Sequence, residues 1–241
     1  MELTKRQKDI LYAIITEFIE TAMPVGSGFI SDKYEIDASP ATIRYEMVKL
    51  AEEGFISKSH SSSGRIPTLL GYRFYIQDLM DEEDVNYLTE IQLKRELAQV
   101  RFQRDRLIRG VTNLLSEITK YASVIMTENG IYYSGLYNLL DYPEFADNKS
   151  FKNILIAFDD LNTLSNVFAR EYIDGRVKVL IGDELNEKIL EDCSIVFTEI
   201  SLYRGERAVM AVIGPKRLNF PRVIPIVRLT SDVLHRLMVG W

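Results

Sequence analysis

The sequence predicts an α+β fold made of two parts. The first third reads as three helices followed by a small hairpin, and the last third contains β-branched segments bounded by glycine or charge. Between them lies a stretch with apolar residues in steps of four and three, which is typical of a long helix. We therefore expect an N-terminal domain over residues 1–80, a connecting helix over 81–122 and an α+β domain over 123–241.

Composition limits the classes of protein that the chain can represent. Its 241 residues allow two small domains, and 46% hydrophobic content indicates a folded protein. No stretch approaches the ~18 apolar residues of a membrane span, and the charged start lacks a signal-peptide core, so we expect a cytoplasmic protein without membrane association. Cys193, His60 and His235 are the only cysteine and histidines. They have no metal-site spacing, so no metal or cofactor is predicted.

The first two helices are marked by their caps and their apolar spacing. Thr4, with Gln7 three residues later, forms a capping-box pattern. The helix that follows carries an apolar stripe and should end before Pro24. Ser27 is placed to cap a short second helix that runs to Lys33.

A third helix is predicted with a strong start and a defined end. Ser39 is a good N-cap, Pro40 suits the first helical position, and Gly54 can take the left-handed conformation that ends a helix. A strand then begins at Phe55, residues 60–64 form a turn, and residues 65–67 return before Thr68 caps the next helix. Three helices followed by a hairpin is the order of a winged helix-turn-helix, which would make residues 1–80 a DNA-binding domain.

The third helix divides into a core side and an outer side. Ile43, Met47 and Leu50 share one stripe and should face the first two helices. The outer side would then carry short apolar groups that can meet thymine methyls and donors that reach bases or phosphates. In the hairpin, small residues allow close approach to a phosphate, and Arg65 can enter a minor groove or pair with phosphate.

These features give a set of candidate DNA contacts. The net charge of −6 argues against nonspecific polyanion binding, but residues 57–75 contain no acid. A solvated helix face and a flexible loop remain the structural alternatives. The candidate DNA-binding residues are Ser39, Ala41, Thr42, Arg44, Tyr45, Val48, Lys49, Lys58, His60, Ser61, Ser63, Arg65, Thr68 and Arg73.

The middle of the chain predicts one helix from Asp84 to about Thr119, on the order of 50 Å long. Its heptad seam has two readings that the sequence leaves open. It can pair between chains as a coiled coil, or it can pack on its own C-terminal domain. The dimerisation candidates are Leu93, Leu97, Val100, Arg104, Leu107, Val111, Leu114 and Ile118.

The C-terminal third predicts alternating helices and strands. Helices are expected over residues 151–170, 184–190 and 220–238, with Pro225 inside the last. Strands are expected over residues 177–181, 194–200 and 208–213. No spacing of residues in this part indicates a catalytic cluster, so no enzymatic activity is predicted.

Several short motifs occur along the chain: Pro24-Val25-Gly26-Ser27, Thr42-Ile43-Arg44, Glu46-Met47, Leu50, Gly54-Phe55, His60 through Ser63-Gly64-Arg65-Ile66-Pro67-Thr68, Gly71-Tyr72-Arg73, Pro143-Glu144-Phe145, Ile181-Gly182, Cys193-Ser194, and Gly214-Pro215 with Arg217. Together these motifs resemble those of the HrcA family of heat-shock transcription repressors. The resemblance implies a homodimeric repressor that binds an inverted-repeat operator, the CIRCE element, upstream of chaperone operons. It also implies a GAF-like C-terminal domain, coupling to a GroE-type chaperonin, and a nucleoid-associated location in the cytoplasm.

The chain departs from the family pattern in two ways. The family commonly has Asn at the position of Tyr45, and Asn can pair bidentately with adenine whereas Tyr cannot. The chain is also short, because Val124-Ile125-Met126 is followed closely by Gly130-Ile131-Tyr132-Tyr133. We therefore expect a reduced GAF-like domain that lacks the family's inserted dimerisation module.

Two other classes of function remain open on the sequence. One is a ligand-sensing regulator in which a small molecule bound in the GAF-like domain controls DNA binding. The other is a protein-interaction module, whose binding would be insensitive to salt because it lacks phosphate contacts.

Overall fold

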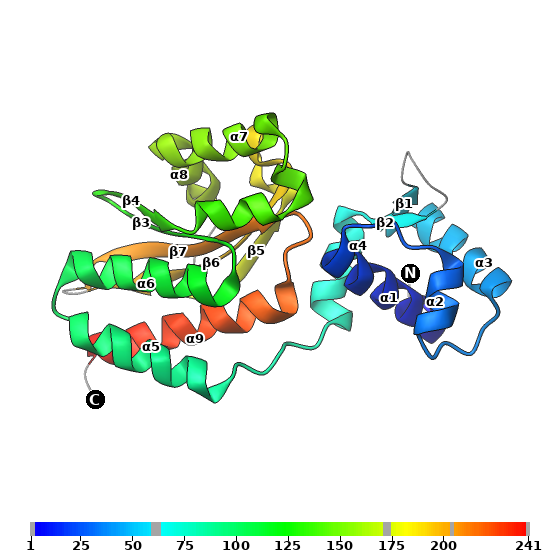
Figure 1. Ribbon diagram of the computed structural model, residues 1–241, viewed down its shortest axis with the longest axis horizontal. Coiled ribbons are helices and arrows are strands. Elements are labelled where there is room, and N and C mark those ends of the chain that lie inside the picture. The colour runs from blue at the N-terminus through cyan, green and yellow to red at the C-terminus, as the bar shows by residue number, and fades with distance from the viewer. Residues whose placement is uncertain (1–2, 59–63, 171–174, 203–204, 240–241) are drawn as a thin grey trace. The chain divides into compact units, whose positions relative to one another are not determined.

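The computed structural model describes residues 3–58, 64–170, 175–202 and 205–239 (Figure 1). It divides into two compact units, Met1–Asp81 and Glu82–Trp241. The first boundary matches the one expected near residue 80. The segment expected to connect two domains is instead part of the second unit.

The first unit is a helical layer closed by a two-stranded hairpin. Its helix α4 continues into a π-helical turn, η1. The elements are α1 (Lys5–Thr21), α2 (Ser27–Lys33), α3 (Pro40–Glu52), β1 (Ile56–Lys58), β2 (Arg65–Pro67), α4 (Leu69–Phe74) and η1 (Tyr75–Leu79). This is the order of elements that the sequence predicts.

Local interactions fix these helices. Thr4 and Gln7 form the predicted capping box of α1. Helix α2 begins one residue earlier than expected, with Gly26 rather than Ser27 at the N-cap. The buried carboxylate of Glu17 on α1 accepts hydrogen bonds from the Lys33 ammonium and, at 2.7 Å, from the Tyr34 hydroxyl. These bonds join α2 to α1, because a buried carboxylate needs such partners.

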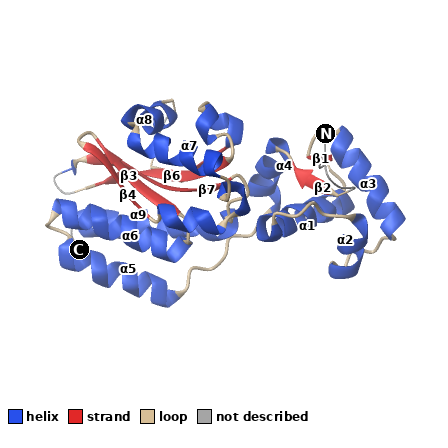
Figure 2. Cartoon of the chain, turned by 45° about the horizontal axis from the view of Figure 1, so that its top comes forward, coloured by secondary structure: helices blue, strands red, loops and turns tan. Residues whose placement is uncertain are grey.

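The second unit begins with two helices where the sequence predicts one, so the prediction of a continuous helix is wrong. Helix α5 (Tyr87–Val100) ends, the chain turns through residues 101–103, and α6 (Arg104–Thr119) returns. The two helices lie side by side (Figures 1 and 2). Leu97 and Val100 of α5 lie against Gly110 of α6, where even an added Cβ would be 3.6–3.8 Å from their side chains. The apolar seam is therefore buried within the chain.

A five-stranded antiparallel sheet forms the centre of the second unit, in the order β4-β3-β7-β6-β5. Helices α7 and α8 cover one face, and α6 and α9 cover the other, with α5 outside them (Figure 2). The bounds are β3 (Ala122–Thr127), β4 (Gly130–Ser134), α7 (Asn148–Asp159), α8 (Leu161–Ala169), β5 (Lys178–Ile181), β6 (Cys193–Ser201), β7 (Arg207–Pro215) and α9 (Phe220–Val239).

The three predicted strands are found within two residues of their expected ends. The predicted helix over 151–170 is instead two helices, because Asp160 ends α7 and its carboxylate accepts the Asn162 amide of α8. The predicted helix over 184–190 is two short 3-10 turns, η4 (Gly182–Leu185) and η5 (Lys188–Leu190). Two further 3-10 turns, η2 (Leu136–Asp141) and η3 (Pro143–Phe145), follow β4.

An ion pair joins two of the family-like motifs in this unit. The guanidinium of Arg217, 7% exposed, donates two hydrogen bonds to the carboxylate of Glu144 in η3. Its carbon also lies 5.6 Å from the centre of the Tyr142 ring. The end of β7 is thereby fixed to the turns that follow β4.

Candidate nucleic-acid interface

Helix α3 has the core and outer sides that its spacing predicts. Ile43, Met47 and Leu50 are buried. Ser39 caps the helix, since its hydroxyl accepts the Thr42 amide at 3.2 Å. The outer residues are exposed or half-buried: Ala41, Thr42, Arg44, Tyr45, Val48 and Lys49.

The outer side of α3 carries a strip of apolar side chains, Ala41, Tyr45 and Val48, which we call the apolar strip. Tyr45 is 60% exposed and Val48 is 40% exposed. The Lys49 ammonium lies 4.5 Å from the centre of the Tyr45 ring, a cation–π distance. The same ammonium is 3.7 Å from the Glu46 carboxylate. Lys49 is therefore engaged on its own helix, while the strip faces outward.

The hairpin is fixed more tightly than the sequence suggests. Strands β1 and β2 pair from Ile56 with Pro67 to Lys58 with Arg65. Arg65 also exchanges two backbone hydrogen bonds of 2.9 Å with Val25, in the turn before α2. Its side chain is only 9% exposed. The bridge to Val25 draws Arg65 into the unit, and contact between Arg65 and DNA stays a prediction.

Three cations meet at a hollow beside the apolar strip. Arg44 of α3, Lys58 of β1 and Arg65 of β2 line it, and its volume is about 460 Å³. The rest of its lining is Gly26, Ser27, Gly28, Met47 and Val48. No carboxylate lines it in the part of the chain that the structure describes. We call it the cationic hollow, and its chemistry suits an anion.

Sequence reasoning named all three cations but missed the hollow that joins them. The turn at Val25 supplies one wall, and the backbone bridge to Arg65 brings that wall to the hairpin. The Pro24-Val25-Gly26 run was the available signal, but it predicts only a turn. A pairing between residues forty positions apart (65 − 25) has no local signature in a sequence.

One of the remaining candidates, Thr68, holds the fold together. The Thr68 hydroxyl donates to the carbonyls of Gly54 (2.6 Å) and Phe55 (2.9 Å) and accepts the Gly71 amide at 3.1 Å. Gly71 permits this closure, because a Cβ there would lie 2.2 Å from the Phe55 oxygen.

Arg73, in α4, is half-buried and does not line the cationic hollow. The candidates His60, Ser61 and Ser63 lie outside the described residues.

The candidate dimerisation seam is mostly buried. Leu93, Leu97, Leu107 and Val111 are 0% exposed, and their neighbours are the other helices of the same unit. Leu114 is also buried, and Val100 and Ile118 are half-buried. These contacts agree with the second of the two alternatives, in which the seam packs on the C-terminal domain of its own chain.

Arg104, one of the dimerisation candidates, begins α6 and makes a network of hydrogen bonds within its own unit. Its guanidinium pairs with both oxygens of Glu206, 2.6 Å from Nε to the nearer one, and donates to the Tyr132 hydroxyl at 3.1 Å. These bonds raise the pKa of Arg104 and lower that of Glu206, chiefly through the hydrogen bonds between them.

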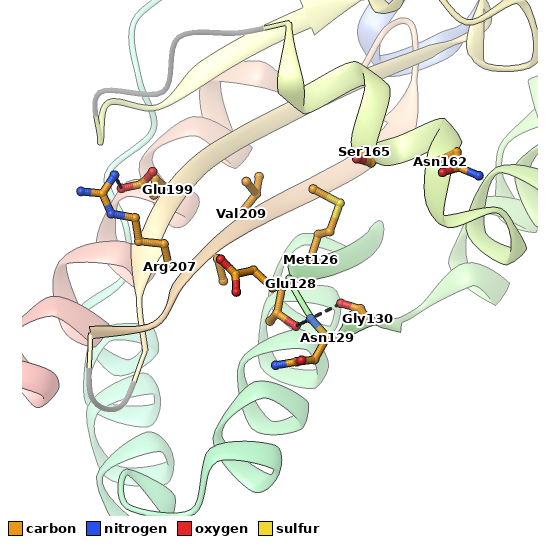
Figure 3. Close-up of a pocket in the computed structure, with 11 residues that line it drawn as sticks. Met126, Glu128, Asn129, Gly130, Asn162, Ser165, Glu199, Arg207 and Val209 are labelled. Carbon is orange, nitrogen blue, oxygen red and sulfur yellow. Dashed lines mark hydrogen bonds and ion pairs between the residues drawn. The ribbon is translucent and has the colours of Figure 1, made fainter.

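A hollow of about 440 Å³ lies at one end of the strands of the sheet in the second unit (Figure 3). It is lined by the β3–β4 turn, by Asn162 and Ser165 of α8, and by the ends of β6 and β7. The Arg207 guanidinium pairs with the Glu199 carboxylate at 3.7 Å, and Glu128 adds a second carboxylate. The described residues contain no cluster of His, Cys, Asp or Glu that could hold a metal ion.

Other features limit chemistry in this unit. Cys193 is buried, and burial raises the pKa of its thiol well above the usual value, so the reactive thiolate is disfavoured.

Across the described ranges, no helix is long and apolar enough to cross a membrane.

Comparison with known proteins identifies the class and the family. The model of the HrcA protein C-terminal domain matches residues 83–224, which is 142 of the 241 residues. A heat-inducible transcription repressor HrcA from Symbiobacterium thermophilum is 26% identical, with 96% of this chain and 98% of the relative covered. One from Lysinibacillus sphaericus is also 26% identical, with 93% and 95% covered.

The chain is thus a transcriptional repressor of heat-shock genes and not an enzyme. It belongs to the HrcA family, whose model covers more than half of its length. The fold has a counterpart in a solved structure titled a hypothetical protein, with a TM-score of 0.73, 19% identity, and coverage of 98% of this chain and 97% of that one.

The alignment lengths show that this chain is the shorter relative. The alignment with the Symbiobacterium thermophilum protein spans 341 positions, whereas this chain has 241 residues. At least 100 positions (341 − 241) of that relative therefore have no counterpart here. Both ends of the relative are nearly covered, so most of the missing positions are internal. An absent inserted segment would produce this result.

Proposed function

We propose that the first unit is a winged helix-turn-helix that binds operator DNA, and that the second is a reduced GAF-like domain. The observation that carries this proposal is the cationic hollow beside the apolar strip. Arg44, Lys58 and Arg65 come from three elements and converge on one place without a carboxylate among the described lining residues. Apolar groups next to converging cations are what a surface needs to read base edges while it holds phosphates.

In this proposal, α3 enters the major groove, which at about 12 Å wide admits a helix. The apolar strip then faces the bases, and the cationic hollow lies against the sugar–phosphate backbone. Arg44 and Lys58 are exposed and make no ion pair within the described residues, so both are available to phosphate. Arg65 is mostly buried, so it would attract phosphate through the positive charge it adds to the lining of the cationic hollow.

We further propose that two copies bind an inverted-repeat operator and repress by covering the promoter. A helix-turn-helix protein reads one half-site, so a palindrome requires two copies at a spacing near 34–36 Å. The second unit would supply the dimer contact by surfaces other than the buried α5–α6 seam. The motif resemblance described above also implies a GroE-type chaperonin as a further partner and nucleoid DNA as the place of action, and we include both in the proposal.

The test is the salt dependence of DNA binding. Each phosphate contact contributes about −0.9 to the slope of log K against log salt on duplex DNA. Lys58→Ala and Arg44→Ala should each weaken binding to an inverted-repeat duplex and make the slope shallower by about 1. Lys152→Ala, at an exposed position of α7 in the second unit, is the matched control and should leave the slope unchanged.

Fluorescence anisotropy titrations over a salt series would give these slopes. Equal slopes for wild type, Lys58→Ala and Arg44→Ala would remove the cationic hollow from the interface. A slope near zero for the wild type would favour the protein-interaction alternative over DNA binding altogether.

A second candidate function is ligand sensing by the second unit. The hollow at the strand ends, about 440 Å³, is within the roughly 300–1,000 Å³ of small-molecule sites. A bound metabolite would raise the melting temperature of the full chain by mass action. A metabolite screen by thermal shift tests this, and a hit that Glu128→Gln does not weaken would exclude this hollow as its site.

A further inference from the structure

We propose that Tyr45 and Val48 recognise the C5 methyl group of thymine in each operator half-site. The inference rests on the proposed function, since it requires α3 to lie in a major groove. It goes further by naming the base and the atoms that the helix reads. The evidence for this inference comes from the apolar strip on α3.

Exposure of the strip is the first observation. Tyr45 is 60% exposed and Val48 is 40% exposed, although the neighbouring stripe of Ile43, Met47 and Leu50 is buried. Residues 45 and 48 are three apart, so they are neighbours on the helix surface. Ala41, four residues before Tyr45, extends the same line. The strip therefore forms one continuous apolar ridge that takes no part in the core of its own unit.

The position of the Tyr45 ring is the second observation. The Lys49 ammonium lies 4.5 Å from the ring centre, and the Glu46 carboxylate is 3.7 Å from that ammonium. Residues 45, 46 and 49 lie on one turn, so these contacts are local to α3 and do not depend on a partner. They restrict the ring before DNA binds, which reduces the entropy lost on contact. A positioned ring can select one feature of a base edge.

The chemistry of the major groove then selects thymine. Adenine, guanine and cytosine present only hydrogen-bond donors and acceptors there, whereas thymine also presents a methyl group. A ridge made of an aromatic ring, an isopropyl group and a methyl group offers no bidentate hydrogen bonding. It gains free energy by burying another apolar group. The thymine methyl is the group in the groove that meets this requirement.

The experiment removes the methyl group and nothing else. An inverted-repeat duplex selected from random sequence by the wild-type protein is remade with deoxyuridine in place of each thymine in turn. At the contacted position we expect about fourfold weaker binding, the effect of exposing one methyl-sized apolar group. Thymines elsewhere should be replaceable without loss, which separates a contact from a general change in the duplex.

Protein variants provide the matched controls. Val48→Ala should bind the thymine duplex more weakly and lose most of its discrimination between thymine and deoxyuridine. Tyr45→Phe keeps the ring and removes the hydroxyl, so it should keep the discrimination. Tyr45→Asn should shift the selected base toward adenine, because an Asn side chain pairs with adenine N6 and N7.

The outcomes separate the inference from the function beneath it. If the wild type selects no sequence from the random pool, the proposed DNA-binding function fails. If it selects an operator in which no thymine is sensitive to deoxyuridine, the function stands and the inference is overturned. If Tyr45→Phe abolishes binding as strongly as Tyr45→Ala, the hydroxyl contacts the backbone and the ring does not read a methyl. All of these α3 variants change an exposed residue, Tyr45 or Val48, so circular dichroism should show them folded.

Discussion

Helix α3 and the α5–α6 pair both carry apolar residues at helical spacing, but the two regions use them in opposite ways. In α6, Leu107 and Val111 are 0% exposed and complete a core that α5 covers. In α3, the core stripe is already complete, and Tyr45 and Val48 are additional apolar residues that remain 60% and 40% exposed. A stripe that fills one side of a helix indicates packing, whereas apolar residues left over after that side is filled indicate contact with something else.

The same comparison explains how charge is used in each region. Arg104 at the start of α6 is held by Glu206 and Tyr132, so its charge is matched within the unit. Arg44 on α3 and Lys58 on β1 line a hollow in which the described residues place no carboxylate. A cation that pairs with a carboxylate of the same unit stabilises the fold. Cations that converge without a carboxylate among the described lining residues are suited to bind an external anion.

The largest expected effect separates the two kinds of apolar residue by stability. Leu107→Ala removes a fully buried side chain and should lower the free energy of unfolding of the second unit by about 2–5 kcal/mol. Val48→Ala removes an exposed one and should change the stability of the first unit by less than about 0.5 kcal/mol. Urea denaturation of the full chain measures both. A small loss for Leu107→Ala would mean that the seam is accessible, as an interchain coiled coil requires.

A smaller effect is expected where charge stabilises the fold. Arg104→Met keeps the length of the side chain but removes the hydrogen bonds to Glu206, which should cost the second unit roughly 1.5–3 kcal/mol at neutral pH. Both side chains are less than a third exposed, so solvent screens the pair only in part. Glu206→Gln is the matched control, and it should cost less because a neutral amide still accepts one hydrogen bond.

The same pair predicts a pH dependence with a defined sign. Arg104 holds the pKa of Glu206 below its unfolded value of about 4.3, so the folded state binds this proton less readily than the unfolded state. The pair's contribution to the free energy of unfolding is complete above the unfolded-state pKa of Glu206. It is lost as the pH falls through the folded-state pKa. Between neutral pH and about pH 3, the wild type should therefore lose more stability than Arg104→Met. If the plots of stability against pH for the wild type and Arg104→Met were parallel, the pair would contribute little to stability.

Local signals explain what the sequence predicted well. Caps at Thr4, Ser39 and Thr68 set the starts of three helices, and each is found in the structure. Strand β6 was expected because it is β-branched, and both its faces are covered by helices (Figure 2). The interactions that form these elements join residues only a few positions apart, so a single sequence contains the information needed to predict them.

Tertiary pairing explains what the sequence did not predict. A heptad seam is satisfied equally by a second chain or by a reversal of the same chain, so the turn at residues 101–103 had no signal of its own. The burial of Arg65 depends on its bridge to Val25, and the anchoring of Arg217 depends on Glu144, 73 residues away. In the candidate site, the outer residues of α3 were predictable from spacing, and the cationic hollow was not.

The smallest effect concerns Thr68, a candidate DNA contact that is also the predicted and observed cap of α4. Its hydroxyl makes three hydrogen bonds, to Gly54, Phe55 and Gly71, and these close the hairpin onto α4. Thr68→Ala should therefore lower the stability of the first unit by about 1 kcal/mol, as the loss of a helix cap does. Thr68→Ser keeps the hydroxyl and should restore most of that stability.

The two roles differ in their salt dependence. A residue that closes the hairpin leaves the number of phosphate contacts unchanged, so Thr68→Ala should bind the operator with the wild-type slope of log K against log salt. Because a hydroxyl releases no counterion, the comparison also needs absolute affinity, measured well below the melting temperature where both proteins are folded. There the affinities should agree within about twofold. A tenfold loss in Thr68→Ala that Thr68→Ser restores, without any change in unfolding, would return Thr68 to the interface.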